Sequence, residues 1–473
     1  MASMLSTSSS SSPPQLIDLE LPEFGIDDAA PVVPVPEYAD RLRAASGRMA
    51  AAGLDVLVVY ADREHSANIA FLTGFDPRFE EALLIIDAAG RRWLLVGNEC
   101  MSYLPDSSLG IEAVLFQEFS LLGQPRGRSR PLRQILADCG VASGRRIGCV
   151  GWKYFEGPLV EGGALALDLP SYLADTIRSL AGDPARVVNA TALMMNPRDG
   201  MRLANSAAQI AVFEHASCLT SSSVLAAVRA IRVGASEREI ARSFRTDGMP
   251  LSCHPMVSFG DKAARGLASP GEGRARIGDA YTLALGVWGA LNCRAGMVVA
   301  DSDGLPEALR SFYPRLVANF FQVMTAWYQA LRVGATGGEV FRAADRARDP
   351  SLFDFALNPG HYLHLDEWVH SPFAEGDGSV LPSGAAIQMD IIPVSRGPAC
   401  GTNGEDGVVL ADGALCAELA RSYPSCWRRI GGRRRFMIGT LGIHLHESVL
   451  PLSNMPAWLP PYALAPQRAF ANR

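Results

Sequence analysis

The residues Asn358–His370 (NPGHYLHLDEWVH) concentrate side chains that can bind protons or metal ions. They include three histidines and two carboxylates, although the whole chain has only 8 histidines. Imidazole and carboxylate groups bind divalent metals, and a neutral imidazole beside a carboxylate can act as a general base near neutral pH. The stretch is therefore consistent with a metal site, with acid–base chemistry that needs no metal, or with packing alone.

His361 is the strongest functional candidate of the three histidines, because it follows the turn residues Pro359 and Gly360. His364 lies three residues further on, which would put both rings on one face of a helix but on opposite sides of an extended strand. We take His364 and His370 as candidate substrate-binding residues. The alternative for each of them is a histidine in a loop or at the rim of a pocket.

Two carboxylates later in the chain, Asp390 and Glu405, are candidate catalytic partners of His361. Asp390 lies in the predicted strand AIQMDIIPV, where it would face the same side as Gln388. An aspartate in such a strand is rarely buried without a partner. Together with His361 the two carboxylates could hold one divalent ion. For Glu405, which precedes Asp406, a surface pair is the alternative.

Five arginines fall within CWRRIGGRRRF, where they form a cluster over residues 428–435. Such a run most often forms a solvated face or a contact between subunits. Binding of an acidic substrate is the alternative, and the sequence leaves the role of this cluster open.

The composition excludes several classes of protein. With 473 residues the chain is long enough for two or three domains, and 48% hydrophobic residues are ample for globular cores. Charged residues make up only 19% and the net charge is −6, which argues against nucleic-acid binding. The 9 cysteines occur singly without a CxxC pair, which favours a reducing compartment over a disulfide framework.

The sequence shows no signals for a membrane. No apolar run reaches the ~18–20 residues that span a bilayer, and the N-terminus lacks a basic segment followed by an apolar core. We therefore expect a cytoplasmic protein without a membrane or nucleic-acid partner. Its expected ligand is a small-molecule substrate.

The distribution of helix and strand signals divides the chain into three segments. Residues 1–36 open with the serine run STSSSSSPP and are predicted to be a disordered tail, because they bury too little apolar surface. Residues 37–190 alternate helices with buried strands such as 56–60, which predicts an α/β domain. Residues 191–473 combine strands with a long helix, expected over about 198–231, which predicts an α+β domain.

Local signals place further elements in the last segment. Ser236 and Glu239 form the capping-box pattern at the start of a second helix. The periodic apolar residues of 309–331 predict a third helix. We find no convincing internal repeat.

The order of these motifs resembles the creatinase and prolidase family, which includes Xaa-Pro aminopeptidases. The motifs that follow the family order include NIAFLTGF (68–75), RVGASEREIA (232–241), NPGHYLH (358–364) and GEDGVVLADG (404–413). The resemblance runs over most of residues 37–450. It implies an α/β N-terminal domain, a C-terminal domain with the pitta-bread fold, and a homodimer.

The resemblance also implies that part of the family's metal site is missing here. Metal-dependent members hold two adjacent divalent ions with two aspartates, one histidine and two glutamates. The aspartate positions fall on Ala284 and Ala295, which cannot bind a metal. The remaining ligand positions fall on His361, Asp390 and Glu405.

A second departure from the family concerns a loop histidine that binds the substrate in the relatives. It lies before the first aspartate strand, where this chain has Gly266 or Leu267. Creatinase also lacks the two aspartates and works without a metal, but it keeps this histidine as its acid–base group. The chain therefore matches neither pattern completely.

The resemblance implies a hydrolase or lyase of a small carboxylated or amide substrate, without a two-metal centre. His361 would be the acid–base group, Asp390 and Glu405 would orient it, and Arg294, beside Ala295, would hold an anion. We expect no cofactor, with one alternative: a single divalent ion that would make the chain a mononuclear Xaa-Pro peptidase. The other alternative is a binding or scaffold protein that has lost catalysis.

Overall fold

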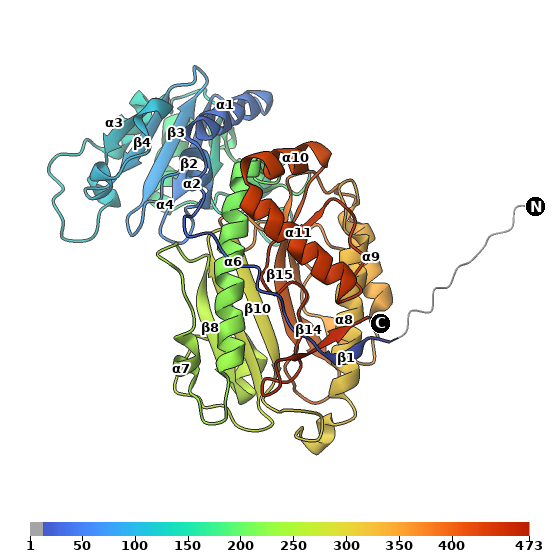
Figure 1. The fold of residues 1–473 in the computed structure, drawn as a ribbon. Helices are drawn as coiled ribbons and strands as arrows, with labels where there is room; N and C mark the ends of the chain where they lie inside the picture. The colour runs from blue at the N-terminus through green and yellow to red at the C-terminus, as the bar shows by residue number, and fades with distance from the viewer. Residues whose placement is uncertain (1–12, 473) are drawn as a thin grey trace, which may run out of the picture. The chain divides into compact units, whose positions relative to one another are not determined.

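The computed structural model describes residues 13–472, which form two compact units (Figure 1). One unit is Val32–Leu203. The other is Ala204–Arg473 together with the segment that ends at Pro31. The first unit is α/β and the second is α+β, as the sequence predicts.

The division between the units differs from the predicted boundary at residue 190. Residues 191–203 stay with the first unit because their side chains bind inside it. The Thr191 hydroxyl accepts a 3.0 Å hydrogen bond from the backbone N–H of Gly151. The Arg202 guanidinium donates a 3.0 Å hydrogen bond to Asn68.

The first unit is built on a six-stranded mixed sheet. Its strands stand in the order β5 (Ile111–Leu115), β4 (Arg92–Val96), β3 (Ala82–Asp87), β2 (Val56–Ala61), β6 (Ile147–Val150) and β7 (Val187–Asn189). Its helices are α1 (Val35–Ala51), α2 (Ala67–Thr73), α3 (Leu132–Asp138), α4 (Ser171–Ala181) and α5 (Ala192–Met195). All six residues of β2 are buried, as in a strand that is covered on both faces. The strand predicted at 56–60 is confirmed.

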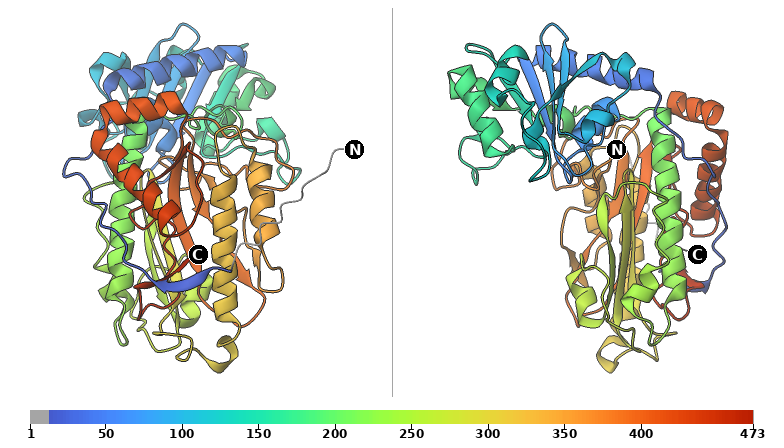
Figure 2. Two further views of the ribbon diagram at one scale, coloured as in Figure 1. Left: turned by 45° about the vertical axis from the view of Figure 1, so that its right-hand side comes forward. Right: turned by 90° about the vertical axis from the view of Figure 1, so that its left-hand side faces the viewer.

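The second unit is built on an antiparallel sheet. Its strands stand in the order β12 (His361–Tyr362), β13 (Ala386–Asp390), β15 (Asn403–Leu410), β10 (Ala290–Met297), β9 (Ala280–Val287) and β8 (Cys253–Phe259), with β16 (Val449–Pro451) beside β15. A smaller pair consists of β11 (Phe353–Phe355) and β14 (Pro393–Ser395). The helices are α6 (Ala207–Ala230), α7 (Glu237–Ala241), α8 (Tyr313–Ala330), α9 (Gly337–Ala347), α10 (Gly413–Ser422) and α11 (Pro424–Gly439). Figure 2 shows α6 along one face of the sheet, with α11 on its outer side.

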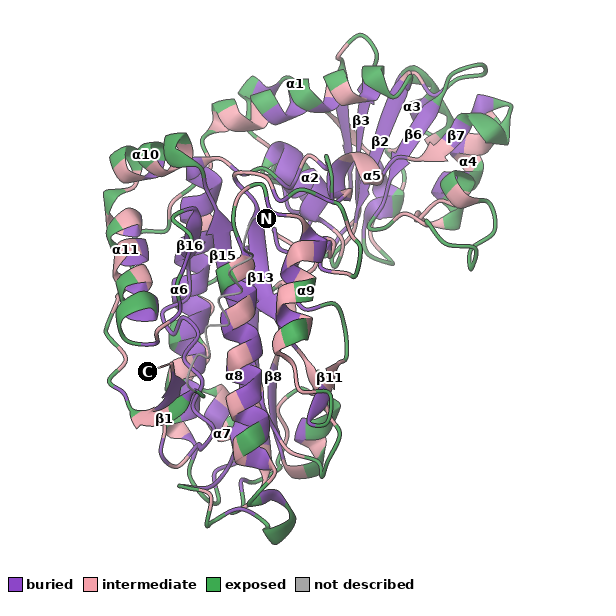
Figure 3. Ribbon diagram, turned by 90° about the vertical axis from the view of Figure 1, so that its right-hand side faces the viewer, coloured by how far each residue is buried: buried purple, intermediate pink, exposed green. Residues whose placement is uncertain are grey.

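Helix α6 is the core helix of the second unit. By length and composition it could cross a membrane, but 78% of its most apolar stretch is buried inside the unit. Figure 3 likewise shows α6 as mostly buried. The helix starts at Ala207 and not near 198, because the Ser206 side chain accepts a hydrogen bond from the backbone N–H of Gln209 and so caps it.

The second unit repeats one connection that the sequence analysis missed. RVGASEREI (232–240) joins α6 to α7, and RVGATGGEV (332–340) joins α8 to α9. Each begins its second helix with a complete capping box, on Ser236 and on Thr336. The same local signal therefore follows both long helices. The expectation that the chain has no internal repeat is corrected by this pair.

The N-terminal segment is ordered over the part that the structure describes, which corrects the predicted disordered tail. β1 (Gln15–Asp18) pairs antiparallel with β17 (Arg468–Ala471). Further on, Phe24 packs edge-on against Phe436 of α11. Residues 1–12, with most of the serine run, lie outside the described residues. Composition misled here because the apolar side chains after the serine run find their partners on a distant part of the chain.

Candidate active site

A row of side chains crosses the large sheet and forms one wall of a cavity of about 430 Å³. Backbone pairing aligns Ala284 with Cys293, Cys293 with Glu405, and Glu405 with Asp390. Directly paired residues of neighbouring strands point to the same face. All four side chains accordingly line the cavity.

His361 brings its imidazole to the same place from β12, the strand next to β13. Its Nε2 lies 3.1 Å from Oε1 of Glu367. The same atom lies 3.9 Å from Oδ2 of Asp390 and 3.9 Å from Oε1 of Glu405. One ring nitrogen therefore meets three carboxylates. The structure brings the three predicted residues together and adds a fourth, while their catalytic roles stay predictions.

The remaining contacts of His361 hold the ring in a fixed orientation. Its Nδ1 lies 3.2 Å from the carbonyl oxygen of Tyr362, which can accept a hydrogen bond from an Nδ1–H group. The ring is completely buried and stacks on Trp368, with ring centroids 4.1 Å apart. This arrangement leaves Nε2 as the nitrogen that faces the carboxylates.

The carboxylates and the burial of the site shift its pKa values. Burial by itself would lower the pKa of His361, but the carboxylates, with Glu367 first, outweigh it and raise the pKa of His361 to about 10. Burial raises the pKa of Asp390 to about 6, although His361 opposes the shift. Burial and the charge of Asp390 raise the pKa of Glu405 well above its usual value. A cation bound here would favour the ionised carboxylates.

Glu367 and Trp368 are the site residues that the sequence analysis did not single out. Backbone pairing of Tyr362 with His370 folds the chain back after β12. This return places Glu367 beside His361. A signal was present, because Glu367 is one of the two carboxylates in the histidine-rich stretch. The direction of the Glu367 side chain depends on the turn after β12, which the residue types alone do not reveal.

A two-metal centre does not fit this cavity. The positions that the resemblance assigns to two metal-binding aspartates are occupied by Ala284 and Ala295, and both line the cavity. Their methyl groups offer no ligand atom. Both alanine positions therefore lie inside the cavity, while the loss of two ligands stays an expectation from the resemblance.

The donor set does fit one cation. His361, Glu367 and Glu405 offer ligand atoms that all lie within 4.8 Å of one another. Oδ1 of Asp390 is buried and receives no hydrogen bond from the described residues. Such an oxygen is costly unless a donor or a cation compensates it. One imidazole and three carboxylates suit a divalent ion such as Mn, Fe or Zn.

Arg294 does not face the cavity, which corrects the prediction that it holds a substrate anion. It lies between Cys293 and Ala295 on β10, so strand alternation turns it to the opposite face. There it is buried, with its Nη2 2.8 Å from Oδ2 of Asp406. Its Nε donates a 2.6 Å hydrogen bond to the carbonyl of Trp458. Arg294 is therefore part of a buried ion pair.

None of the three histidines of the histidine-rich stretch is among the described residues that line the cavity, but His361 lies beside three carboxylates that do. His364 is completely buried and packs edge-on against Phe213 of α6, with ring centroids 5.1 Å apart. β12 ends at Tyr362, and His364 contacts Phe213 while His361 stacks on Trp368, so the two rings have different surroundings. The substrate-binding roles of His364 and His370 stay predictions.

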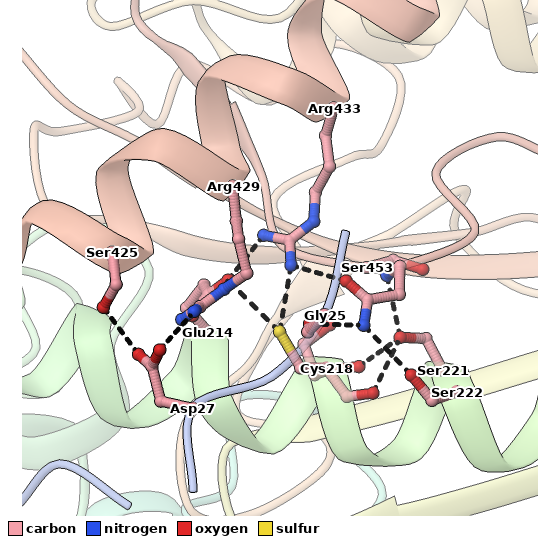
Figure 4. Close-up of polar contacts among 12 residues, drawn as sticks. Gly25, Asp27, Glu214, Cys218, Ser221, Ser222, Ser425, Arg429, Arg433 and Ser453 are labelled. Carbon is pink, nitrogen blue, oxygen red and sulfur yellow. Dashed lines mark hydrogen bonds and ion pairs between the residues drawn. The ribbon is translucent and has the colours of Figure 1, made fainter. Parts of the chain in front are cut away.

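The arginine cluster 428–435 lies on α11, and two of its members are buried (Figure 4). Nε of Arg429 and Nη1 of Arg433 donate hydrogen bonds of 2.8 and 2.7 Å to the carboxylate of Glu214 on α6. Asp27 of the N-terminal segment lies 2.8 Å from Arg429. These charges therefore join three segments of the second unit, and the expectation of a wholly solvated face is corrected for these two arginines.

Comparison with known proteins finds this fold in solved peptidase structures. Dipeptidase PepE from Mycobacterium ulcerans aligns with a TM-score of 0.60 and 16% identity, over 80% of this chain and 95% of that chain. The prolidase from Pyrococcus horikoshii OT3 aligns with a TM-score of 0.58 and 15% identity, over 79% and 95%. The Xaa-Pro dipeptidase from Bacillus anthracis aligns with a TM-score of 0.58 and 16% identity, over 80% and 95%. No protein-family model and no curated protein sequence matches the chain.

These likenesses define the class of fold. The chain has the fold of the prolidases and Xaa-Pro dipeptidases, so the predicted pitta-bread architecture is confirmed. At 15–16% identity the similarity shows the fold, and the chemistry must be argued from the residues of the cavity.

Proposed function

We propose that this protein is a hydrolase that cleaves a C–N bond of a small amide substrate, with one divalent cation and not two at its centre. The observation that carries the proposal is the convergence of three carboxylates within 3.9 Å of the same nitrogen of His361. The structural neighbours are named as dipeptidases and prolidases, which supports amide hydrolysis as the reaction.

Each residue of the cluster has a role in this proposal. His361 would bind the cation through Nε2, because its Nδ1 is directed to the carbonyl of Tyr362. Glu405 and Asp390 would supply carboxylate oxygens from the sheet. A bound divalent ion polarises a carbonyl group and lowers the pKa of a bound water. The Glu367 side chain is 25% exposed, against 8% for Asp390 and Glu405, which suits it to exchange protons with the cavity.

A metal-free hydrolase is the second candidate, and the pKa of His361 favours it. At about 10 this pKa keeps the imidazole protonated at neutral pH, so it would act as a general acid and not as the expected base. Water would attack the carbonyl carbon and give a proton to a carboxylate of the cluster, and the imidazolium would donate a proton to the leaving nitrogen as the C–N bond breaks. Asp390 and Glu405 would orient it and bind an N–H group of the substrate.

Metal content and hydrolysis, measured on the same preparations, separate the two candidates. The protein is analysed by elemental mass spectrometry as purified, after chelation, and after addition of Mn or Zn. Hydrolysis is followed on Xaa-Pro dipeptides and on N-acyl amino acids and their amides. The single-cation proposal predicts about one bound ion per chain, and loss of both the ion and hydrolysis in His361→Ala. The metal-free candidate predicts hydrolysis that survives chelation and is lost in His361→Ala.

His364→Ala is the matched control, because it removes a buried imidazole from the same stretch outside the cavity. It should keep ion content and hydrolysis. A wild-type protein that binds no ion and cleaves none of these substrates contradicts both candidates. That result would leave a binding protein as the function of this fold.

A further inference from the structure

Side chains of opposite charge line the cavity. Its wall holds the carboxyl groups of Glu367, Asp390 and Glu405. Among the described residues that line it, Arg265 is the one arginine, and there is no lysine. Arg265 is exposed and forms no ion pair with the described residues. Its guanidinium is therefore available to a ligand that enters the cavity.

The segment that carries Arg265 is held in place on both sides. On one side, Lys262 forms an ion pair with Glu237, whose side chain is only 1% exposed. On the other side, the carbonyl oxygen of Leu267 lies 2.6 Å from Nε2 of His254. Leu267 also has a φ of 46°, a left-handed conformation that is costly for a leucine. A braced loop presents a charged side chain with less loss of entropy on binding.

Apart from these charged groups, the wall of the cavity is largely apolar. The apolar side chains that line it include Met256, Leu291, Leu357, Trp368 and Ile392. At about 430 Å³ the cavity has the size of a small-molecule site. A ligand that fits this lining has a polar group for the carboxylates, an apolar side group and an anion for Arg265.

We propose that Arg265 binds the carboxylate of the substrate, which makes the substrate an N-acyl amino acid with an apolar side chain. The assignment of the amide end rests on the proposed hydrolase. A guanidinium can bind a carboxylate through two parallel N–H···O bonds, which a lysine cannot reproduce. Arg265 thereby takes the role that the sequence analysis gave to Arg294.

Matched pairs of ligands test this assignment through binding. Calorimetry on the purified full-length protein compares N-acetyl-leucine with N-acetyl-leucinamide, and N-acetyl-phenylalanine with its amide. We expect each acid to bind about tenfold more tightly than its amide. Arg265→Gln should reduce this ratio to about one, and Arg265→Lys should retain part of it. The preference should also weaken as sodium chloride is raised, because Arg265 is exposed.

Arg276→Gln is the control, since Arg276 is exposed but does not line the cavity. It removes the same charge and should leave the ratio unchanged. If no acid binds more tightly than its amide, or if the preference survives in Arg265→Gln, the assignment is wrong.

Binding and turnover report on separate proposals. Loss of the carboxylate preference in Arg265→Gln, in a protein that hydrolyses none of the substrates, supports the binding site and contradicts the hydrolase. Hydrolysis that depends on His361, together with equal binding of acids and amides, supports the hydrolase and contradicts the role of Arg265.

Discussion

At the scale of single residues, strand alternation separates the cavity from the structural core. On β10, Cys293 and Ala295 face the cavity while Arg294 between them faces the other way. On β15, Glu405 faces the cavity and Asp406 pairs with Arg294. Of two neighbouring residues, one therefore faces the cavity and the other forms the buried ion pair. Substitutions one position apart should have different consequences.

Replacing the two cavity alanines by aspartates should restore a second cation site. Ala284 and Ala295 both line the cavity, so new carboxylates at these positions would project toward Glu405. The double variant Ala284→Asp with Ala295→Asp should bind about two ions per chain where the wild type binds about one. Elemental mass spectrometry measures the ratio. Each single variant serves as a control, and a double variant that gains no ion would show that the alanines are not at former ligand positions.

Removing Arg294 should affect stability and not ligand binding. In Arg294→Met the carboxylate of Asp406 would stay buried without its partner, which typically costs ~3–5 kcal/mol. Urea denaturation measures the loss in free energy of unfolding. Adding Asp406→Leu should recover much of it, since no charge is then left unpaired. A variant of full stability that binds cavity ligands more weakly would argue against this assignment.

At the scale of elements, a buried charge network joins α6, α11 and the N-terminal segment. Glu214 of α6 is completely buried and binds both Arg429 and Arg433 of α11. Arg429 also binds Asp27. Because this one carboxylate pairs with both arginines of α11, the packing of α11 on α6 should depend strongly on it.

Glu214→Gln should destabilise the second unit by ~3–5 kcal/mol, because buried Arg433 loses its carboxylate partner and Arg429 keeps only Asp27. The effect should depend on pH. Burial alone would raise the pKa of Glu214, but Arg433 and Arg429 outweigh it and hold that pKa below its usual value. A carboxyl group with a depressed pKa contributes stability above its unfolded-state pKa of about 4.3 and loses it as the pH falls through the folded-state value.

Thermal unfolding at several pH values checks this expectation. The difference in Tm between wild type and Glu214→Gln should be constant from neutral pH to about 5 and shrink below about 4.3. Glu418→Gln on the exposed side of α10 is the control and should match the wild type throughout. A difference that grows with acidification would contradict the sign of the shift.

At the scale of the whole molecule, the described part of the chain begins and ends in the second unit. β1 pairs with β17, so the two ends of the described chain are joined in one small sheet. The first unit is therefore inserted, in sequence order, into the second. Changes near the N-terminus should act on the second unit.

Deleting residues 1–31 should lower the thermal stability of the second unit and leave the first unit unchanged. The deletion removes β1, the Phe24 contact and the Asp27 ion pair, all of which lie on the second unit. Hydrogen exchange followed by mass spectrometry should show faster exchange in β17 and α11 and an unchanged rate in β2. Equal exchange in both proteins would mean that this segment does not stabilise the unit.

The resemblance to the creatinase and prolidase family also leads us to propose a homodimer. Light scattering coupled to size-exclusion chromatography should give about twice the chain mass of 50.6 kDa. A mass equal to one chain over the micromolar range would contradict it.

Many local elements and the main candidate residues of this protein could be predicted from the sequence alone, because the patterns that specify them span only a few neighbouring residues. Buried strands such as β2 and the capping box at Ser236 follow from residue type and spacing over a few positions. Sequence motifs also pointed to the candidates His361, Asp390 and Glu405. In the structure both carboxylates lie 3.9 Å from Nε2 of His361.

Only the tertiary structure decided which groups share the cavity. Glu367 reaches His361 through a turn of the chain, and Arg294 points away because of the phase of β10. Arg265 reaches the cavity from the connection between β8 and β9. The N-terminal segment is ordered by β17, more than four hundred residues away. These features depend on strand register and on contacts between distant segments, which residue types in one window do not specify.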